Sequence, residues 1–441
     1  MEGTTNFRGG LQQKADAIAD SCVRCGKCFE VCPMAEPAGL GSADPGRVLT
    51  GVVDILRTGS GPLEATKWAE VCSHSGFCVD VCDYGVDPRL MLILARFSLK
   101  RDAVDRREQG RENFQDMVRA TQVLPRLQLS ADDLERLSPR RWTEDQPPDL
   151  IFYTGCNILR TPHIALLCLD VLDALELRYA IYGGPANCCG ILQFRPGDAD
   201  NAGRQAYATI KRFAETGTSE VVSWCPTCMI QIGETVLPVY EKTEGAAGFE
   251  MSMMAVFLAR HIDILKGLFH NRVEKRVALH EHPGSSGVTD AVRMLLEAIP
   301  GLEFIDLDQP RAGYMCNSLS GLPDYRRELH DLQLHAAKSA GVETLAGIYH
   351  ACHRDLCSHE KDWPFEVVNF MELIGEAIGV DRPDVFKQLK KLQNIDAIVA
   401  QSREMIDYYD LNINEVREVV AKNMVGEQSL PLKGSRQEYE A

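Results

Sequence analysis

The chain lacks the features that mark exported and membrane-embedded proteins. Its first 22 residues contain no basic segment followed by an apolar run, so no secretory signal is expected. No stretch of about 18 apolar residues runs without a charge, so no membrane span is expected. The most apolar candidate, residues 245–269, is interrupted by Glu250, Arg260 and Asp263 and is expected to form a buried helix.

Positive charge and nucleotide-binding motifs are also scarce. The chain has 47 Lys and Arg against 63 Asp and Glu, a net charge of −16, which argues against a nucleic acid or an anionic membrane as partner. No G-x-G-x-x-G follows an expected strand, and no G-K-[ST] phosphate loop is present. We therefore expect the chain to bind neither flavin nor nicotinamide.

Cysteine, in contrast, is abundant and clustered. The chain has 16 cysteines, and most of them fall into a few short motifs. Without a secretory signal, such a protein is expected in the cytoplasm, where cysteines bind metals more often than they form disulfides.

The first motif contains Cys22, Cys25, Cys28 and Cys32, followed by Pro33. Its spacing, C-x2-C-x2-C-x3-C-P, is that of bacterial ferredoxins, in which three thiolates hold one iron–sulfur cluster and the fourth holds another. A zinc site is the alternative interpretation.

The second motif contains Cys72, Cys78 and Cys82, with Ser75 where the ferredoxin spacing requires a further cysteine. If the ligands cross as in ferredoxins, Cys82 joins the first three cysteines around one [4Fe–4S] cluster, and Cys32 joins Cys72 and Cys78 around the other. The missing cysteine resembles the three-iron site of fumarate reductase iron–sulfur subunits, so a [3Fe–4S] cluster is expected. A [4Fe–4S] cluster with Ser75 or His74 as fourth ligand and an empty site are the alternatives.

A third motif gathers five cysteines in the frame C-x31-C-C-G-x34-C-P-x-C: Cys156, Cys188, Cys189, Cys225 and Cys228. A zinc ion or a cubane cluster needs only four thiolates. The side chains of two cysteines that are adjacent in sequence diverge from each other, so the pair suits a larger metal–sulfur assembly. A zinc site with a spare cysteine is the alternative. Cys168 lies in an apolar helical pattern and is expected to be packed in the core.

From about residue 148, β-rich runs alternate with amphipathic helical stretches, which predicts parallel sheet with crossover helices. This part is predicted to be duplicated, because spacings of 33 and 36 residues recur in both halves. The second half then carries, at the five cysteine positions, Pro283, Met315, Cys316, Cys352 and Asp355.

The second half therefore keeps two of the five thiolates. Further metal-binding residues are expected near the ends of the strands that carry these positions: His280, His282, His350, His353 and Cys357. They indicate either a repurposed metal site or substrate pocket, or a decayed site retained for the fold.

The expected fold class is α+β with several domains. Residues 1–100 form a small helical ferredoxin-like domain with two clusters, and residues 101–147 a helical linker. Residues 148–272 and 273–425 form the two α/β halves, the first complete and the second degenerate. The tail, residues 426–441, is expected to be disordered.

The five-cysteine motif resembles the cysteine-rich (CCG) domain family, in particular the catalytic subunits of heterodisulfide reductases. The resemblance implies that all five cysteines hold a noncubane [4Fe–4S] cluster that cleaves disulfides. Gly190 is expected to let the backbone approach that cluster.

The resemblance further implies an electron-transferring subunit that reduces a disulfide or oxidises thiols. Its expected partner is a flavoprotein subunit, and a membrane protein is a further candidate partner. The alternatives are the iron–sulfur subunit of a flavin-linked dehydrogenase (2-hydroxyacid, glycerol phosphate or succinate/fumarate type) that passes electrons to quinone, and a non-catalytic scaffold.

Overall fold

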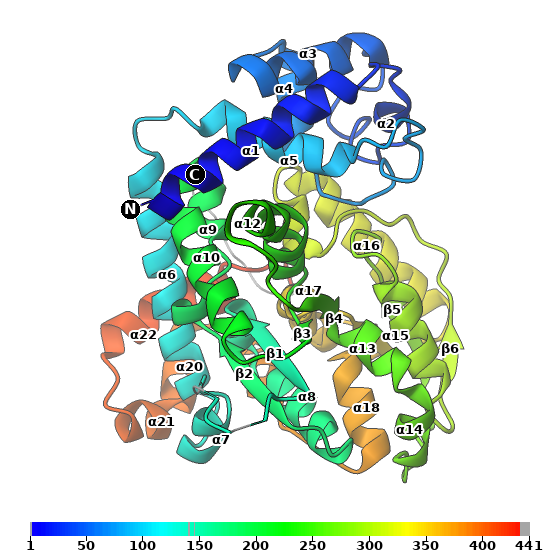
Figure 1. Ribbon diagram of the computed structural model, residues 1–441. Helices are drawn as coiled ribbons and strands as arrows, with labels where there is room; N and C mark the ends of the chain where they lie inside the picture. The colour runs from blue at the N-terminus through cyan, green and yellow to red at the C-terminus, as the bar shows by residue number, and fades with distance from the viewer. Residues whose placement is uncertain (1, 140–141, 145, 433–441) are drawn as a thin grey trace.

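The computed structural model describes residues 2–139, 142–144 and 146–432. A helical N-terminal module lies at one end of the molecule, and two α/β units lie next to each other below it (Figure 1). None of the helices in these described ranges is both long enough and apolar enough to cross a membrane.

The N-terminal module consists of helices joined by cysteine-containing loops. Asp44 and Asp87 cap two of these helices through their side chains, and a proline follows each cap at the first helical position. The loops at residues 31–44 and 72–87 therefore each lead into a capped helix start. The helices are α1 (Glu2–Ser21), α2 (Lys27–Glu30), α3 (Pro45–Thr58), α4 (Leu63–Val71) and α5 (Pro88–Lys100).

The region expected to be a linker forms α6 (Arg106–Arg126) and α7 (Ala131–Arg136). Helix α6 does more than connect two domains, because it packs against η1 (Asn157–Arg160) and α9 (Ile191–Phe194) of the first α/β unit. It therefore forms one wall of that unit.

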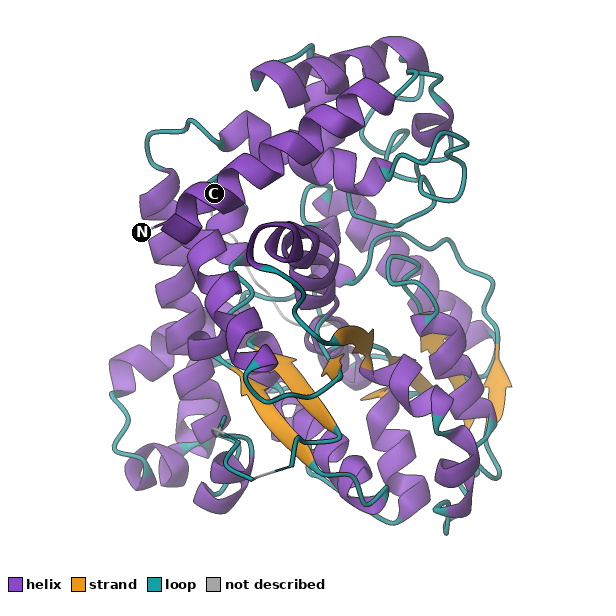
Figure 2. Cartoon of the chain, viewed as in Figure 1, coloured by secondary structure: helices purple, strands orange, loops and turns teal. Residues whose placement is uncertain are grey.

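Each α/β unit contains a four-stranded parallel sheet surrounded by helices (Figure 2). The strand order is β2-β1-β3-β4 in the first sheet and β6-β5-β7-β8 in the second. The same order in both confirms the predicted α+β fold with a duplicated parallel unit. The strands are β1 (Leu150–Gly155), β2 (Tyr179–Gly183), β3 (Glu220–Ser223), β4 (Glu250–Met253), β5 (Arg276–His280), β6 (Glu303–Ile305), β7 (Thr344–Gly347) and β8 (Glu366–Asn369).

The helical segments of the first unit follow its strands in the order expected for crossover connections. They are η1, α8 (Pro162–Ala174), η2 (Pro185–Asn187), α9, α10 (Ala199–Ala214), α11 (Pro226–Cys228), the π-helix η3 (Met229–Val236), α12 (Leu237–Glu244), α13 (Met254–Arg260) and α14 (Ile262–Gly267).

The second unit continues into a helical C-terminal segment. Its helices are α15 (Val288–Glu297), η4 (Cys316–Leu319), α16 (Pro323–Ser339), α17 (His350–Leu356), η5 (Cys357–Lys361) and α18 (Phe370–Ile378). The C-terminal segment contains α19 (Val385–Lys390), α20 (Ile395–Gln401), α21 (Arg403–Tyr408), α22 (Ile413–Val420) and the π-helix η6 (Ala421–Val425).

Each unit packs one of its helices against the other unit. Helix α13 follows the last strand of the first unit but packs on α15 of the second, and α18 of the second unit packs on α8 of the first. The contact between α18 and α8 is close: a Cβ at Gly375 would lie 2.7 Å from Leu167 Cδ2. The two units consequently share one hydrophobic core.

The sequence suggested that the apolar segment 245–269 forms one helix, but it does not. The segment contains strand β4, in which Glu250 pairs with Glu220 of β3 and Met253 pairs with Ser223, and it forms α13 and α14 only after this strand. Pairing with the neighbouring strand overrides the helical pattern of its first residues. Cys168 is fully buried in α8, as predicted.

The start of the tail is ordered, contrary to expectation. Glu427 accepts hydrogen bonds from Arg160 (3.1 Å) and Arg354 (2.9 Å), and its main-chain oxygen accepts one from Lys390 Nζ. Composition suggested disorder because it does not reveal ionic partners far away in the sequence. Residues 433–441 lie outside the described part of the chain.

Candidate metal centres

The first three cysteines of the first motif meet the last cysteine of the second motif in the N-terminal module. Cys22, Cys25, Cys28 and Cys82 line one cavity. Burial raises the pKa of Cys28 to about 12, and the charges of the other three cysteines add to this rise. The structure therefore brings together the four residues predicted to hold the first cluster.

Cys32, Cys72 and Cys78 form a second group. Burial is the main cause of the raised pKa of both Cys72 and Cys78, and the charge of Cys32 contributes to each. Trp68 donates a hydrogen bond from its indole Nε1 to Cys32 Sγ at 3.3 Å. The crossed grouping expected from the ferredoxin spacing is thus present.

The two alternative fourth ligands both contact the second α/β unit. Ser75 Oγ lies 2.9 Å from Ser73 Oγ and accepts a hydrogen bond from the backbone N–H of Gly313 at 2.7 Å. The His74 ring stacks on Tyr314 with its centroid 5.5 Å away, and its nitrogens have no hydrogen-bond partner among the described residues. Burial lowers the pKa of His74 well below its usual value, so the ring is neutral.

The five-cysteine motif lies at the carboxyl edge of the first sheet. Cys156 follows β1 directly, Cys225 is the N-cap of α11 just after β3, and Cys228 ends α11. Cys188 and Cys189 come from the loop between η2 and α9. Because β1 and β3 are parallel neighbours, their carboxyl ends bring these segments together, as in other open α/β sheets.

The five thiols form one contiguous buried group. Hydrogen bonds connect Cys156 to Cys188, Cys188 to Cys189, Cys189 to Cys228, and Cys228 to Cys225. The hydrogen bond with Cys228 and the N–H groups of the α11 N-terminus outweigh burial and lower the pKa of Cys225 to about 7. Such a set of adjoining sulfurs is a donor set for soft metals.

Two glycines shape this group, Gly155 and Gly190. Gly155 has φ +67°, and a Cβ there would lie 3.0 Å from Cys228 Sγ. Gly190 has φ +80°, but its Cβ would collide with the Ala202 carbonyl oxygen at 2.4 Å. The Gly190 N–H is hydrogen-bonded to Cys188, so the backbone approaches the sulfurs there as expected, and a side chain at this position would also clash with α10. The sequence motif gave no signal for Gly155.

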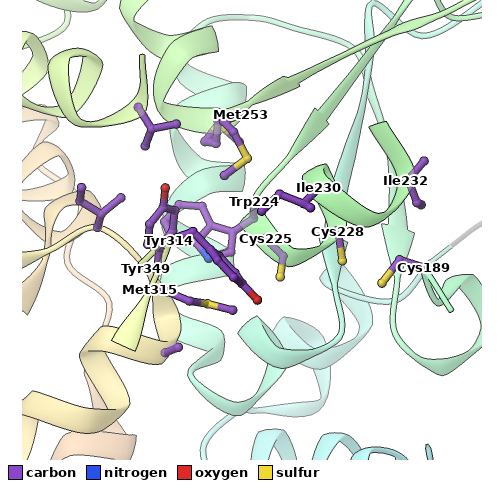
Figure 3. Packing of buried hydrophobic residues seen from close by; sticks show 14 of the residues in the cluster. Cys189, Trp224, Cys225, Cys228, Ile230, Ile232, Met253, Tyr314, Met315 and Tyr349 are labelled. Atoms are coloured by element: carbon purple, nitrogen blue, oxygen red, sulfur yellow. The ribbon is translucent and has the colours of Figure 1, made fainter. Parts of the chain in front are cut away.

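Residues outside the motif enclose the five-cysteine group. Met117 of α6 is buried against Cys156 and Cys188, with Phe114 packed beside it. On another side, the Tyr314 hydroxyl lies 3.2 Å from Thr227 Oγ1, and Trp224 stacks on Phe370 with centroids 5.9 Å apart. Figure 3 shows Cys225, Cys228 and Cys189 in a row, with Trp224 and Tyr314 next to Cys225.

The sheet register changes the alignment of the two halves. Tyr153 pairs with Ser223 in the first sheet, and His280 pairs with Gly347 in the second. Cys228 lies five residues after Ser223, and Cys352 lies five residues after Gly347.

Cys352 is consequently the counterpart of Cys228, and Tyr349, the N-cap of α17, is the counterpart of Cys225. The spacing alignment, which placed Cys352 opposite Cys225 and Asp355 opposite Cys228, was wrong. The paired strand residues are three residues closer together in the second half, and Cys352 lies three residues farther beyond its strand than Cys225 does, so the two differences cancel in the count.

The candidate residues of the second half separate into different places. His280, His282, Cys316 and Cys352 are buried together, with their ligand atoms within 4.8 Å of one another. His353 instead joins His163, Glu372 and Asp384. His350 accepts a hydrogen bond from Trp224, and buried Cys357 lies near Lys390 and Asp384. His353, His350 and Cys357 therefore do not belong to the group around Cys316.

Comparison with known proteins gives a consistent result for the two modules. The family model for the 4Fe-4S dicluster domain matches residues 18–86, and the model for the cysteine-rich domain matches residues 150–233. No solved structure matches the chain significantly.

Among curated proteins, the chain is 24% identical to a subunit of the dihydromethanophenazine:CoB--CoM heterodisulfide reductase of Methanosarcina mazei, over 82% of this chain and 94% of that protein. The Methanosarcina barkeri protein of the same name is also 24% identical, with the same coverage. A subunit of the fumarate reductase (CoM/CoB) of Methanothermobacter marburgensis is 26% identical over 52% of this chain and 46% of that protein. The chain is therefore an iron–sulfur protein with a 4Fe-4S dicluster domain and a cysteine-rich domain, homologous to this heterodisulfide reductase subunit.

Proposed function

We propose that this chain is the electron-transferring iron–sulfur subunit of a heterodisulfide-reductase-like complex, and that it reduces a disulfide or oxidises thiols at the five-cysteine site. The observation that carries the proposal is the buried row of five contacting thiols at the edge of the first sheet. The similarity to the Methanosarcina heterodisulfide reductase subunit over 82% of the chain supports it.

The five thiols fit a noncubane [4Fe–4S] cluster better than a single ion. One tetrahedral ion takes four thiolates, whereas here a fifth buried sulfur continues the same row. When bound, the cluster supplies one-electron chemistry next to a disulfide, which takes up two electrons and two protons in total to give two thiols. Cys156, Cys188, Cys189, Cys225 and Cys228 would hold the cluster, and the buried side chains of Met117 and Trp224 would exclude water from it.

The N-terminal module is proposed to supply or remove these electrons. Cys22, Cys25, Cys28 and Cys82 would hold a [4Fe–4S] cluster, and Cys32, Cys72 and Cys78 a [3Fe–4S] cluster. Ser75 supports the three-iron form, because its hydroxyl is already engaged by Ser73 and by the N–H of Gly313.

A continuous set of contacts joins the second of these sites to the five cysteines. His74, between Cys72 and Cys78, stacks on Tyr314; the Tyr314 hydroxyl lies 3.2 Å from Thr227 Oγ1. The Thr227 hydroxyl is in turn hydrogen-bonded to Cys225. This arrangement supports the three-cysteine site as the nearer electron donor or acceptor.

The proposal is tested by Cys189→Ser in the full chain, with Cys168→Ala as the matched control. Cys168 is equally buried but lies in α8, away from the row of thiols. Cys189→Ser should abolish disulfide turnover while the N-terminal clusters keep their EPR signals. Turnover that persists in a variant without the noncubane cluster would contradict the proposal.

A flavoprotein subunit is proposed as partner, in the reducing environment of the cytoplasm.

A second candidate function is the iron–sulfur subunit of a flavin-linked dehydrogenase of the succinate/fumarate, 2-hydroxyacid or glycerol phosphate type, passing electrons to quinone. The similarity to a fumarate reductase subunit favours it. It predicts that a dehydrogenase flavoprotein co-purifies with the chain and that Cys189→Ser leaves electron transfer from this flavoprotein to the N-terminal clusters intact.

A further inference from the structure

The second α/β unit contains a compact group of four potential ligands that the five-cysteine chemistry does not use. His280 ends β5, His282 follows two residues later, Cys316 begins η4, and Cys352 lies in the first turn of α17. All four side chains are buried. We propose that they bind one Zn²⁺ ion as a Cys2His2 site.

The distances suit a tetrahedral ion. His280 Nε2 lies 3.1 Å from His282 Nε2 and 3.1 Å from Cys316 Sγ, and Cys316 Sγ lies 3.6 Å from His282 Nε2. Bonds of about 2.0 Å to nitrogen and about 2.3 Å to sulfur place neighbouring ligand atoms of a tetrahedral zinc roughly 3.3–3.8 Å apart. The ligand atoms therefore already lie close to the separations that zinc requires.

Hydrogen bonds fix which histidine nitrogens face the centre. His282 Nδ1 lies 2.8 Å from the carbonyl oxygen of Ala312, and His280 Nδ1 contacts Gln333 Oε1. The orientation of the Gln333 amide is set by its Nε2, which donates to Leu279 O at 3.2 Å. Since both partners are acceptors, each Nδ1 carries the proton.

Both Nε2 atoms then present lone pairs to the same point. Two lone pairs facing each other need a cation or a proton between them, and two thiols lie beside them. A hydrogen bond from the Nδ1–H of a ligating histidine to an oxygen acceptor, as both histidines make here, is typical of zinc sites.

Neighbouring polar groups already have other partners. Cys316 also lies within 4.8 Å of His330 and Asp355. Asp355 is paired with Arg326 at 3.6 Å, and His330 Nδ1 contacts Ser429 Oγ at 2.7 Å. Neither residue is needed to complete four ligands. His280 and His282 also line a cavity with Asp306 and Gln309, which offers an entry path for the ion.

Four protein ligands leave no open position, which is the arrangement of a structural zinc site. The ligands lie beside the contacts that dock the N-terminal module. Gly284, two residues after His282, accepts a hydrogen bond from Arg89 at 2.7 Å, and its N–H donates to Gly313 O at 3.0 Å. The ion would therefore tie together the loops that contact Ser75 and carry Tyr314.

The sheet register explains how the site differs from the five-cysteine site. His282 occupies the position of Gly155, next to the counterpart of Cys228, and His280 that of Tyr153. Two strand-end histidines thus replace cysteines from the loops. The inference does not depend on the proposed redox function.

The test is the zinc and iron content of the full-length protein purified without oxygen, together with X-ray absorption at the zinc edge. Wild-type protein should contain one zinc ion per chain with two nitrogen and two sulfur neighbours. His282→Ala and Cys352→Ser should each lose this zinc and retain the iron, whereas Cys357→Ser, a buried cysteine outside the group, should retain both. His282→Cys preserves four ligands and should keep zinc with three sulfur neighbours.

Absence of stoichiometric zinc from the wild-type protein would overturn the inference. So would zinc that survives both ligand substitutions, or iron bound in its place. If His282→Ala does not fold, loss of zinc from the folded His282→Cys variant would equally overturn it. Failure of the proposed redox function would appear instead in disulfide turnover and the iron signals, with the zinc content unchanged.

Discussion

Trp224 donates a hydrogen bond of 3.1 Å from its indole Nε1 to Nδ1 of His350, and this bond joins the two α/β units. Trp224 precedes Cys225 of the five-cysteine site, and His350 lies two residues before Cys352 of the proposed zinc site. Burial lowers the pKa of His350 to about 3, so its ring is neutral and Nδ1 can accept. The indole also stacks on Phe370.

Replacing Trp224 by Phe removes the donor but retains an aromatic ring. The free energy of unfolding should fall by about 1–2 kcal/mol, since a buried acceptor left unpaired costs roughly 1–3 kcal/mol. Chemical denaturation of the holoprotein measures this change. Trp142→Phe serves as the control, because Trp142 Nε1 donates to the exposed carbonyl of Gln146, which water can reach. Equal losses in the two variants would contradict a special role for the bond to His350.

Gly155→Ala should prevent assembly at the five-cysteine site. The new Cβ would lie 3.0 Å from Cys228 Sγ, and φ of +67° adds roughly 1–2 kcal/mol of backbone strain. Iron analysis and EPR should show loss of the noncubane cluster and retention of the N-terminal clusters.

Gly248→Ala is the matched control for this substitution. Gly248 has φ +80°, but nothing lies within 4 Å of its Cβ position, so the variant carries only the backbone strain. If both variants kept all their iron, the proposed role of Gly155 beside the sulfurs would be wrong.

The cysteine groups of the N-terminal module and the first unit could be predicted because their spacing is a direct consequence of how a loop surrounds a cluster. The ferredoxin spacing anticipated that Cys82 lies with Cys28 and that Cys32 lies with Cys72, and the structure shows both groups. In the structure the parallel neighbours β1 and β3 bring Cys156 and Cys225 to one sheet edge.

The second unit could not be read in the same way. Counting residues aligned Cys352 with Cys225, because the chain is three residues shorter before β7 and Cys352 lies three residues farther past its strand than Cys225 does. Only hydrogen-bond register distinguishes the two alignments. The contribution of α6 was also missed, since Met117 reaches Cys156 through helix packing that no local motif encodes.

Ser75→Cys should convert the proposed three-iron cluster into a four-iron cluster. The substitution restores the ferredoxin spacing beside Cys72 and Cys78. The three-iron EPR signal of the oxidised protein should disappear, and the iron content should rise by one atom per chain. Ser73→Cys, whose hydroxyl lies 2.9 Å from that of Ser75 but is off the ferredoxin spacing, should leave the signal unchanged. Wild-type protein without a three-iron signal would instead support His74 or Ser75 as a fourth ligand.

Glu427→Gln should destabilise the protein in a pH-dependent way. The carboxylate accepts hydrogen bonds from Arg160 and Arg354, so its neutralisation should cost about 2–3 kcal/mol, in the range of hydrogen bonds to charged groups. Burial would raise the pKa of Glu427, but Arg354 and Arg160 outweigh it and lower the pKa from 4.5 to about 2.

A carboxyl group whose pKa is lowered by folding stabilises the native state above its unfolded pKa. The difference in stability between wild type and Glu427→Gln should therefore be constant above about pH 5 and should shrink as the pH falls from 4.5 toward 2. Thermal unfolding of both proteins across this range measures the difference, and Glu404→Gln, an exposed carboxylate on α21, controls for general charge effects. A difference that grows on acidification would show that Glu427 does not act through its buried arginines.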